Sequence, residues 1–133
     1  MAKTVVCIED DPEFLALMQL MLYDTDVTII SAIGGEAGLE AVREHRPDLV
    51  LLDLMMPDMN GWDVCRAMRG DAELRQIPVI VVTALSTRYD RIYGERVAHV
   101  ADYITKPFMP AQLRDSVAAV LSYGAVAAAP FAQ

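Results

Sequence analysis

The sequence has little of what marks secreted, membrane-spanning or nucleic-acid-binding proteins. Its longest apolar runs fall far short of the roughly 20 residues that cross a bilayer, so we expect no membrane insertion, and no export signal is visible. Its two cysteines, Cys7 and Cys65, lack metal-ligand or redox spacing, which indicates buried, reduced thiols in a cytoplasmic protein. Lys and Arg number 11 against 19 Asp and Glu, and this net charge of −8 argues against nucleic acid as a partner.

The length of 133 residues is enough for one domain with its own core and too short for two. The hydrophobic fraction of 54% and the charged fraction of 23% are typical of a compact chain. Residues 124–133, GAVAAAPFAQ, have low complexity. We interpret them as a flexible tail or a linker stub that follows a domain of residues 1–123.

Apolar runs rich in β-branched residues alternate with amphipathic stretches along the chain. The runs predict five strands, at residues 3–8, 27–32, 48–52, 78–84 and 101–104. The stretches predict five helices, at residues 13–23, 36–45, 62–68, 86–99 and 110–123. Because the first, third and fourth strands are apolar on both faces, helices are expected on both sides of the sheet. This pattern predicts a doubly wound α/β fold with a five-stranded parallel sheet in the flavodoxin-like order 2-1-3-4-5.

Polar side chains stand at the carboxyl ends of four predicted strands, where ligands bind in open parallel sheets. They are Glu9, Asp10 and Asp11 after the first strand, Asp53 after the third, Thr83 at the end of the fourth and Lys106 after the fifth. Carboxylates that lie close together repel one another and need positive charge to stay ionised. Mg²⁺ suits them because it takes oxygen ligands, while a lysine can bind phosphoryl oxygens. The group indicates phosphoryl transfer to an aspartate nucleophile.

Several of these residues also have an ordinary structural interpretation. Asp53 can be a plain strand cap, although this leaves the acids after the first strand unexplained. Asp11 at a helix start is favoured by the helix dipole, and we do not count it as a ligand. Thr83 alone is a common strand-end hydroxyl, and Tyr103 alone is a half-buried aromatic residue.

The motifs together resemble the receiver domain of two-component response regulators, over residues 3 to about 122. The resemblance rests on the acidic pair in IEDDP, on LLDLMMPDMNG, on TA after the fourth strand and on YITKPF after the fifth. Each motif alone is weak. Their order and spacing, 43 residues from Asp10 to Asp53 and 30 from Asp53 to Thr83, are highly specific.

The resemblance implies a role for each residue. Asp53 is the expected phosphoacceptor, which receives a phosphoryl group from a histidine kinase or a histidine phosphotransfer protein. Asp10, Asp53 and the backbone carbonyl of Met55 are expected to bind Mg²⁺ directly, and Glu9 through a water molecule. Lys106 is expected to pair with the phosphoryl oxygens. The protein is then a signalling switch and not an enzyme, since it catalyses only its own phosphorylation and dephosphorylation.

The resemblance also implies a route to a downstream protein target. Thr83 would turn its hydroxyl toward the phosphoryl group, and Tyr103 would swing inward behind it. The last strand and the two helices beside it would form the surface that changes. That surface would carry Arg88, Arg91, Arg96 and Gln112.

Further details of the sequence set expectations for geometry and kinetics. The resemblance suggests a cis bond before Pro107. Met55 and Leu85 lie two residues after Asp53 and Thr83, and neither side chain can orient a hydrolytic water, so slow dephosphorylation is expected. The glycine usual after the fourth helix is replaced by RVAHVA, and a left-handed helix stop is harder without it.

Other functions share parts of this pattern. Dehalogenase-type phosphatases also use an aspartate nucleophile with Mg²⁺, but they place a second aspartate where this chain has Met55. An electron carrier on the same fold would need a phosphate-cradling loop that we do not find. Within the receiver interpretation, the chain is a stand-alone regulator, as a monomer or weak dimer, or the front of a longer effector protein.

Overall fold

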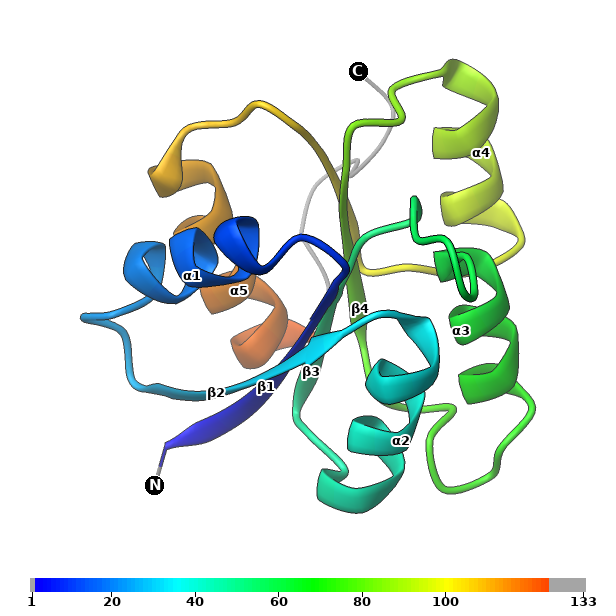
Figure 1. Ribbon diagram of the computed structural model, residues 1–133, viewed down its shortest axis with the longest axis horizontal. Helices are drawn as coiled ribbons and strands as arrows, with labels where there is room; N and C mark the ends of the chain where they lie inside the picture. The colour runs from blue at the N-terminus through cyan, green and yellow to red at the C-terminus, as the bar shows by residue number, and fades with distance from the viewer. Residues whose placement is uncertain (1, 125–133) are drawn as a thin grey trace.

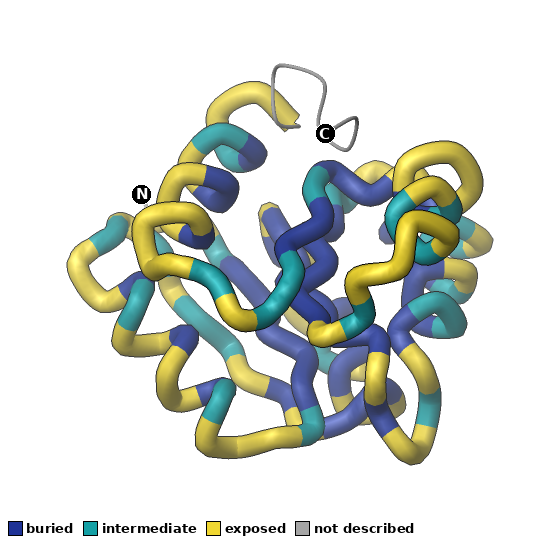
Figure 2. Tube along the Cα trace, turned by 90° about the horizontal axis from the view of Figure 1, so that it is seen from above, coloured by how far each residue is buried: buried dark blue, intermediate teal, exposed yellow. Residues whose placement is uncertain are grey.

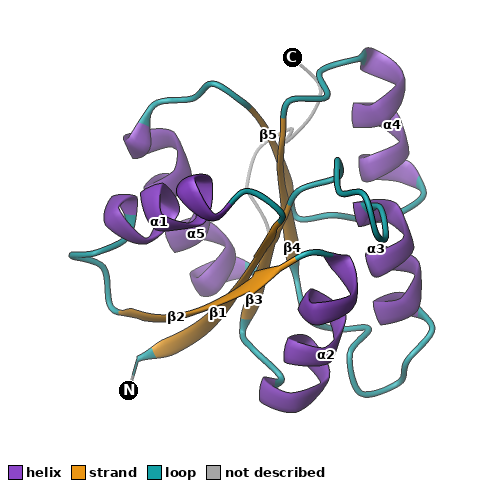
Figure 3. Cartoon of the chain, viewed as in Figure 1, coloured by secondary structure: helices purple, strands orange, loops and turns teal. Residues whose placement is uncertain are grey.

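The computed structural model describes residues 2–124, which form a sheet between two layers of helices (Figure 1; Figure 3). The strands are β1 (Lys3–Glu9), β2 (Val27–Ile33), β3 (Leu49–Leu52), β4 (Val79–Thr83) and β5 (Asp102–Thr105). The helices are α1 (Pro12–Met21), α2 (Gly35–His45), α3 (Gly61–Arg69), α4 (Arg88–Arg96) and α5 (Pro110–Tyr123). Strands and helices alternate along the described chain, as the sequence predicts.

The sheet is parallel throughout, in the order β2-β1-β3-β4-β5, which confirms the predicted fold class. The strand β1 lies inside the sheet and pairs Ile8 with Leu52 of β3 and with Ala32 of β2. All residues of β3 and β4 are buried, because helices cover both faces of these strands. Since the strands point the same way, the carboxyl ends of β1, β3, β4 and β5 meet at one edge of the sheet.

Two hydrophobic cores lie on the two faces of the sheet, because successive side chains of a strand point to opposite sides. Cys7 and Leu51 belong to the core beneath α1 and α5. Ile8, Leu52 and Cys65 belong to the core beneath α2, α3 and α4. Figure 2 shows the buried residues gathered in the middle of the molecule, with exposed residues around them. Both cysteines are buried and unpaired, as expected.

Three helices begin with a capping side chain from the residue just before them. Asp11, Asn60 and Thr87 stand at the N-cap positions of α1, α3 and α4, and each accepts a hydrogen bond from a backbone N–H two or three residues on. Asp11 therefore has the helix-start role that we expected from the sequence. Helix α2 begins after Gly34, which has no side chain to accept such a bond.

Helix α4 is shorter than predicted, because Thr87 caps its start and the helix ends at Arg96. The chain then adopts a left-handed conformation at His99, where φ is 53°. Histidine enters this region more often than most residues that carry a Cβ. The missing glycine therefore does not prevent a left-handed turn, but moves it beyond the end of the helix.

Within residues 2–124, no helix is both long and apolar enough to cross a membrane.

Helix α5 has the bounds that the sequence predicts, and Gly124 follows it with a positive φ of 83°. Residues 125–133, which make up most of the predicted tail or linker, lie outside the described residues.

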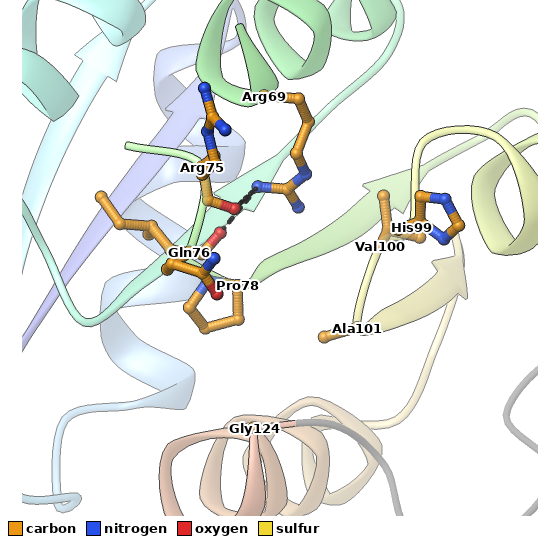
Figure 4. A pocket seen from close by; sticks show the side chains of 9 residues that line it. Arg69, Arg75, Gln76, Pro78, His99, Val100, Ala101 and Gly124 are labelled. Atoms are coloured by element: carbon orange, nitrogen blue, oxygen red, sulfur yellow. Dashed lines mark hydrogen bonds between the residues drawn. The ribbon is translucent and has the colours of Figure 1, made fainter. Parts of the chain in front are cut away.

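A surface pocket of about 420 Å³ lies at the amino ends of the strands, away from the predicted site (Figure 4). Its lining comes from the end of α3, from the connections that lead into β4 and β5, and from Gly124. The guanidinium of Arg69 donates hydrogen bonds to the backbone carbonyls of Arg75 and Ile77, at 3.1 and 3.0 Å. This arginine fastens the α3–β4 connection, and none of the predicted site residues lines the pocket.

The turn from β3 into α3 brings two backbone segments close together at Gly61. The N–H of Gly61 donates to the carbonyl of Leu54 at 3.1 Å. A Cβ at position 61 would lie 2.5 Å from the carbonyl oxygen of Asp53 and 2.8 Å from the Cα of Leu54. Backbone atoms cannot rotate away as a side chain can, so this turn requires glycine.

We expect Gly61→Ala to lower the free energy of unfolding by about 1–3 kcal/mol, since the added methyl group overpacks against backbone. Gly70→Ala is the matched control, because the nearest atom to a Cβ there is 3.4 Å away. Its stability is expected to stay within about 1 kcal/mol of the parent protein. Urea unfolding followed by circular dichroism measures both variants. Equal stability of the two would contradict the steric argument.

Candidate functional site

The predicted site residues meet at the carboxyl edge of the sheet. Glu9 and Thr83 are the last residues of β1 and β4, while Asp53 and Lys106 directly follow β3 and β5. Backbone hydrogen bonds hold these strand ends together. The N–H of Asp53 donates to the carbonyl of Ile8 at 3.0 Å, and the N–H of Lys106 donates to the carbonyl of Thr83 at 2.8 Å.

The ammonium group of Lys106 lies between two buried carboxylates. Its Nζ is 2.7 Å from Oε1 of Glu9 and 3.5 Å from Oδ2 of Asp53. The same nitrogen lies 4.0 Å from the ring centroid of Phe14 in α1. The Glu9 and Asp53 side chains are 2% and 6% exposed, so these charges interact away from bulk water, where they attract more strongly. The ring adds a cation–π contact that fixes the ammonium in place.

Burial makes ionisation of Glu9 costly. Desolvation raises the pKa of Glu9 to about 7, the hydrogen bond from Lys106 acts in the opposite direction, and Asp53 adds to the increase. Oε2 of Glu9 accepts hydrogen bonds from the backbone N–H groups of Asp10 and Asp11, at 3.1 and 3.3 Å. Both oxygens of Glu9 thus have partners, yet one lysine does not fully compensate the negative charge at this edge.

Asp53 is held by the chain that follows it. Its Oδ1 accepts a hydrogen bond from the backbone N–H of Met55 at 3.2 Å. The Met55 residue is 53% exposed, so its side chain contributes little to the core. The backbone of this connection is therefore turned toward the carboxylate while its side chain reaches solvent.

Glu9, Asp10 and Asp53 form the group in the described part of the chain that can hold a metal ion. Each offers one carboxylate oxygen, and these atoms lie within 4.8 Å of one another. Adjacent ligand atoms in the octahedron of Mg²⁺ are about 3 Å apart, so these carboxylates must move closer together to share one ion. Three carboxylates and the Lys106 ammonium leave a formal charge of −2, which matches a divalent cation. Asp11 is not in the group, because its carboxylate caps α1.

Thr83 and Tyr103 are linked through the backbone of Leu85. The hydroxyl oxygen of Thr83 accepts a hydrogen bond from the N–H of Leu85 at 3.3 Å. The hydroxyl of Tyr103 donates a hydrogen bond to the carbonyl of Leu85 at 2.8 Å. Arg91 of α4 lies over the Tyr103 ring at 5.2 Å and donates to the hydroxyl of Thr105 at 3.0 Å. Tyr103 as a whole residue is only 3% exposed. Tyr103 therefore already lies inward in this structure, in the position to which the resemblance implies that it swings.

The bond between Lys106 and Pro107 is cis, as expected. Two further side chains at the site have no sequence signal of their own. Phe14 is one of several apolar residues of α1, and no feature of the sequence distinguishes it as the residue whose ring contacts Lys106. Arg91 is expected on an exposed surface, but its contact with Tyr103 depends on how α4 packs against β5.

The chain is similar to curated response regulators. It is 41% identical over 118 residues to the DNA-binding response regulator MtrA of Mycolicibacterium smegmatis, and the match covers 85% of this chain and 48% of MtrA. It is 30% identical over 128 residues to the alkaline phosphatase synthesis transcriptional regulatory protein PhoP of Bacillus subtilis, which covers 96% of this chain and 52% of PhoP. The chain thus spans about half the length of these relatives.

The relatives correct one expectation. A net charge of −8 argued against nucleic acid as a partner, but MtrA is named as a DNA-binding protein. The charge of 133 residues says nothing of a protein twice as long, and we withdraw the expectation.

A solved structure and a family profile agree with these relatives. The signal receiver domain of a signal transduction histidine kinase from Syntrophus aciditrophicus matches with a TM-score of 0.82 and 29% identity, over 99% of this chain and 100% of that chain. The profile of the response regulator receiver domain matches residues 5–118. This range contains Glu9, Asp10, Asp53, Thr83 and Lys106, the residues at the carboxyl edge of the sheet. The chain belongs to the response regulator receiver domain family.

Proposed function

We propose that this chain is the phosphoacceptor switch of a two-component phosphorelay and that Asp53 is the residue phosphorylated. The main support is the position of the Lys106 ammonium, between Glu9 and Asp53 and beside three convergent carboxylates. The donor is a phosphohistidine, on a histidine kinase or on a histidine phosphotransfer protein.

In the proposed reaction, a carboxylate oxygen of Asp53 attacks the phosphorus atom of the phosphohistidine. The P–O bond forms as the P–N bond breaks, and the released imidazole takes a proton from water. Lys106 Nζ, 3.5 Å from Oδ2 of Asp53, is close enough to bind a phosphoryl oxygen after a small movement. Its positive charge stabilises the charge that the transferred group carries.

The proposed metal is Mg²⁺, because the residues present offer oxygen ligands and a formal charge of −2. Asp10, Asp53 and the Met55 carbonyl would bind it directly. Glu9 would act through a water molecule, since its two oxygens already accept from Lys106 and from backbone N–H groups. When bound, the metal supplies positive charge to the phosphoryl oxygens.

The proposed response passes through the connection between β4 and α4. Thr83 turns toward the phosphoryl group and gives up its bond with the N–H of Leu85. The carbonyl of Leu85 holds the hydroxyl of Tyr103, so the change reaches β5 and the surface of α4, β5 and α5. Because Tyr103 lies inward in this structure, phosphorylation stabilises that position relative to others and does not create it. A downstream protein then binds this surface.

The proposal includes no reaction beyond the phosphorylation and dephosphorylation of the chain itself. We assign the receiver domain to residues 1–123 and place it in the cytoplasm. Met55 and Leu85 are apolar, and the Met55 side chain reaches solvent, so neither aligns a water with the phosphoryl group. The phosphorylated state is therefore long-lived.

Asp53→Asn is expected to abolish phosphorylation by acetyl phosphate, because the amide is not a nucleophile under these conditions. Intact-protein mass spectrometry after incubation with acetyl phosphate and Mg²⁺ measures the added phosphoryl group. Asp11→Asn is the control, since this carboxylate caps α1 outside the acidic group. Labelling of Asp53→Asn at the parent level would sink the assignment.

Asp10→Asn is expected to weaken Mg²⁺ binding on the order of tenfold or more, as loss of a metal ligand does. Asp11→Asn removes the same charge from the next residue and is expected to change the affinity by only about threefold or less. Titration calorimetry with MgCl₂ measures both. The ligand assignment fails if the two variants bind Mg²⁺ equally well.

The aspartyl phosphate is expected to have a half-life of minutes or longer in the presence of Mg²⁺. Met55→Asn is expected to shorten it several-fold, because a carboxamide at this exposed position can orient a water molecule. Loss of the phosphoryl mass after removal of acetyl phosphate gives the rate. A half-life of seconds in the parent chain, or a variant with the parent rate, contradicts this explanation.

A further inference from the structure

Helix α2 is capped by a residue from a distant part of the chain. Gly34 stands at its N-cap position with a φ of 94° and offers no side chain. The carboxylate of Asp58 accepts hydrogen bonds from the N–H groups of Gly35 and Glu36, at 3.1 and 3.0 Å. Asp58 belongs to the connection between β3 and α3, which follows the proposed phosphoacceptor Asp53. It satisfies two backbone donors that the helix leaves without partners, and its negative charge faces the positive end of the helix dipole.

The β3–α3 connection is seated tightly on the start of α2. A Cβ at Gly34 would lie 3.1 Å from Oδ2 of Asp58, and a Cβ at Gly35 would lie 2.5 Å from the carbonyl oxygen of Met59. Glycine at these two positions admits the connection, and any side chain at Gly35 would displace its backbone. The helices α2 and α3 also lie next to each other on one face of the sheet (Figure 1).

The start of α2 is also bound to the end of β1, beside the carboxylates of Glu9 and Asp53. The N–H of Gly34 donates to the carbonyl of Glu9 at 3.1 Å. The N–H of Asp53 donates to the carbonyl of Ile8, so β1 and β3 are joined at their ends. The chain from Asp53 to Asp58, the start of α2 and the end of β1 therefore form a closed ring of contacts beside the carboxylates. Asp58 is the side chain that closes it.

We propose that Asp58 is a positioning residue for the metal site: it fastens the β3–α3 connection to α2 and thereby fixes the backbone of Met55 beside Glu9 and Asp53. This inference rests on the proposed function, in which the Met55 carbonyl binds Mg²⁺. Met55 lies three residues before Asp58 in the same connection, and its N–H is bound to Asp53. Leu54 and Met56 hold the near part of the connection in the core, and Asp58 is the side chain that ties its outer part to α2. Without Asp58, that outer part would lose its two hydrogen bonds to the start of α2.

The ionisation of Asp58 agrees with this role. Its hydrogen bonds from the N–H groups of Glu36 and Gly35 hold the pKa of the Asp58 carboxyl below its usual value. The Asp58 carboxylate therefore keeps its negative charge at neutral pH, as its contact with the start of α2 requires.

A merely structural role predicts a different result from a positioning role. Loss of a helix cap lowers stability and leaves the metal site unchanged. Loss of a positioning contact raises the Mg²⁺ concentration needed for phosphorylation, but leaves the rate at saturating Mg²⁺ close to the parent rate. The two are separated by measuring affinity and maximal rate on the same variants.

The experiment compares Asp58→Ala and Asp58→Asn with Asp71→Ala. Asp71 is the control. Its carboxylate accepts one hydrogen bond from a backbone N–H, that of Glu73 at 2.9 Å, and it lies after α3 at the opposite edge of the sheet. Titration calorimetry with MgCl₂ gives the affinity, and acetyl phosphate labelling across a Mg²⁺ series gives the rates. Asp58→Ala is expected to weaken Mg²⁺ binding about tenfold, with the maximal rate within about twofold of the parent. The Mg²⁺ affinity of Asp58→Asn is expected to lie between those of the parent chain and Asp58→Ala, because one amide oxygen replaces two carboxylate oxygens as acceptor.

Unchanged Mg²⁺ affinity in Asp58→Ala overturns the inference, whatever happens to the melting temperature. An equal loss in Asp71→Ala also overturns it, because the effect would then be one of net charge. If Asp58→Ala does not fold, the affinity of Asp58→Asn decides in the same way. Failure of the proposed function gives a separate result, since the parent chain itself would then show no Mg²⁺ binding or no labelling of Asp53.

Discussion

The ion pair between Lys106 and Glu9 is the interaction on which the carboxyl edge depends. Two carboxylates of low exposure stand side by side there, and each would be costly to bury without a cation. Lys106 supplies that cation from β5, across the whole width of β3 and β4, and the ring of Phe14 holds it from α1. One side chain thus ties the first strand of the chain to the last and leaves a net negative charge at this edge of the sheet.

The fold could be predicted from the sequence because the patterns that indicate strands and helices are local and recur along the chain. Apolar runs with turn residues between them identified every strand, and the rules for parallel sheets then left few orders to consider. The misjudged boundaries have side-chain causes. Glu9 was placed after β1 but belongs to it, because Lys106 allows a carboxylate to be buried at the last strand position. Helix α4 was predicted too long, because the cap from Thr87 and the turn at His99 leave no periodic signal.

The site was predictable as far as strand ends determine it. Asp53, Thr83 and Lys106 each stand at or directly after the end of a buried strand, so the topology alone brings them together. The contacts of Phe14, Arg91 and Asp58 were not predictable, since each joins two different elements and depends on how a helix packs against its neighbours. For Tyr103, the resemblance implied an inward position but not the contact that holds the side chain there. Its hydroxyl partner is a backbone carbonyl, which any residue at position 85 would supply.

The division of the interior into two cores has a consequence for how such a domain can diversify. Side chains that face α1 and α5 share few neighbours with those that face α2, α3 and α4, because the backbone of the sheet separates them. Substitutions on the two sides should therefore combine almost independently in their effects on folding. One flank of the molecule can then acquire a new binding preference over generations while the opposite flank keeps its own, and a common scaffold can serve many distinct pairings.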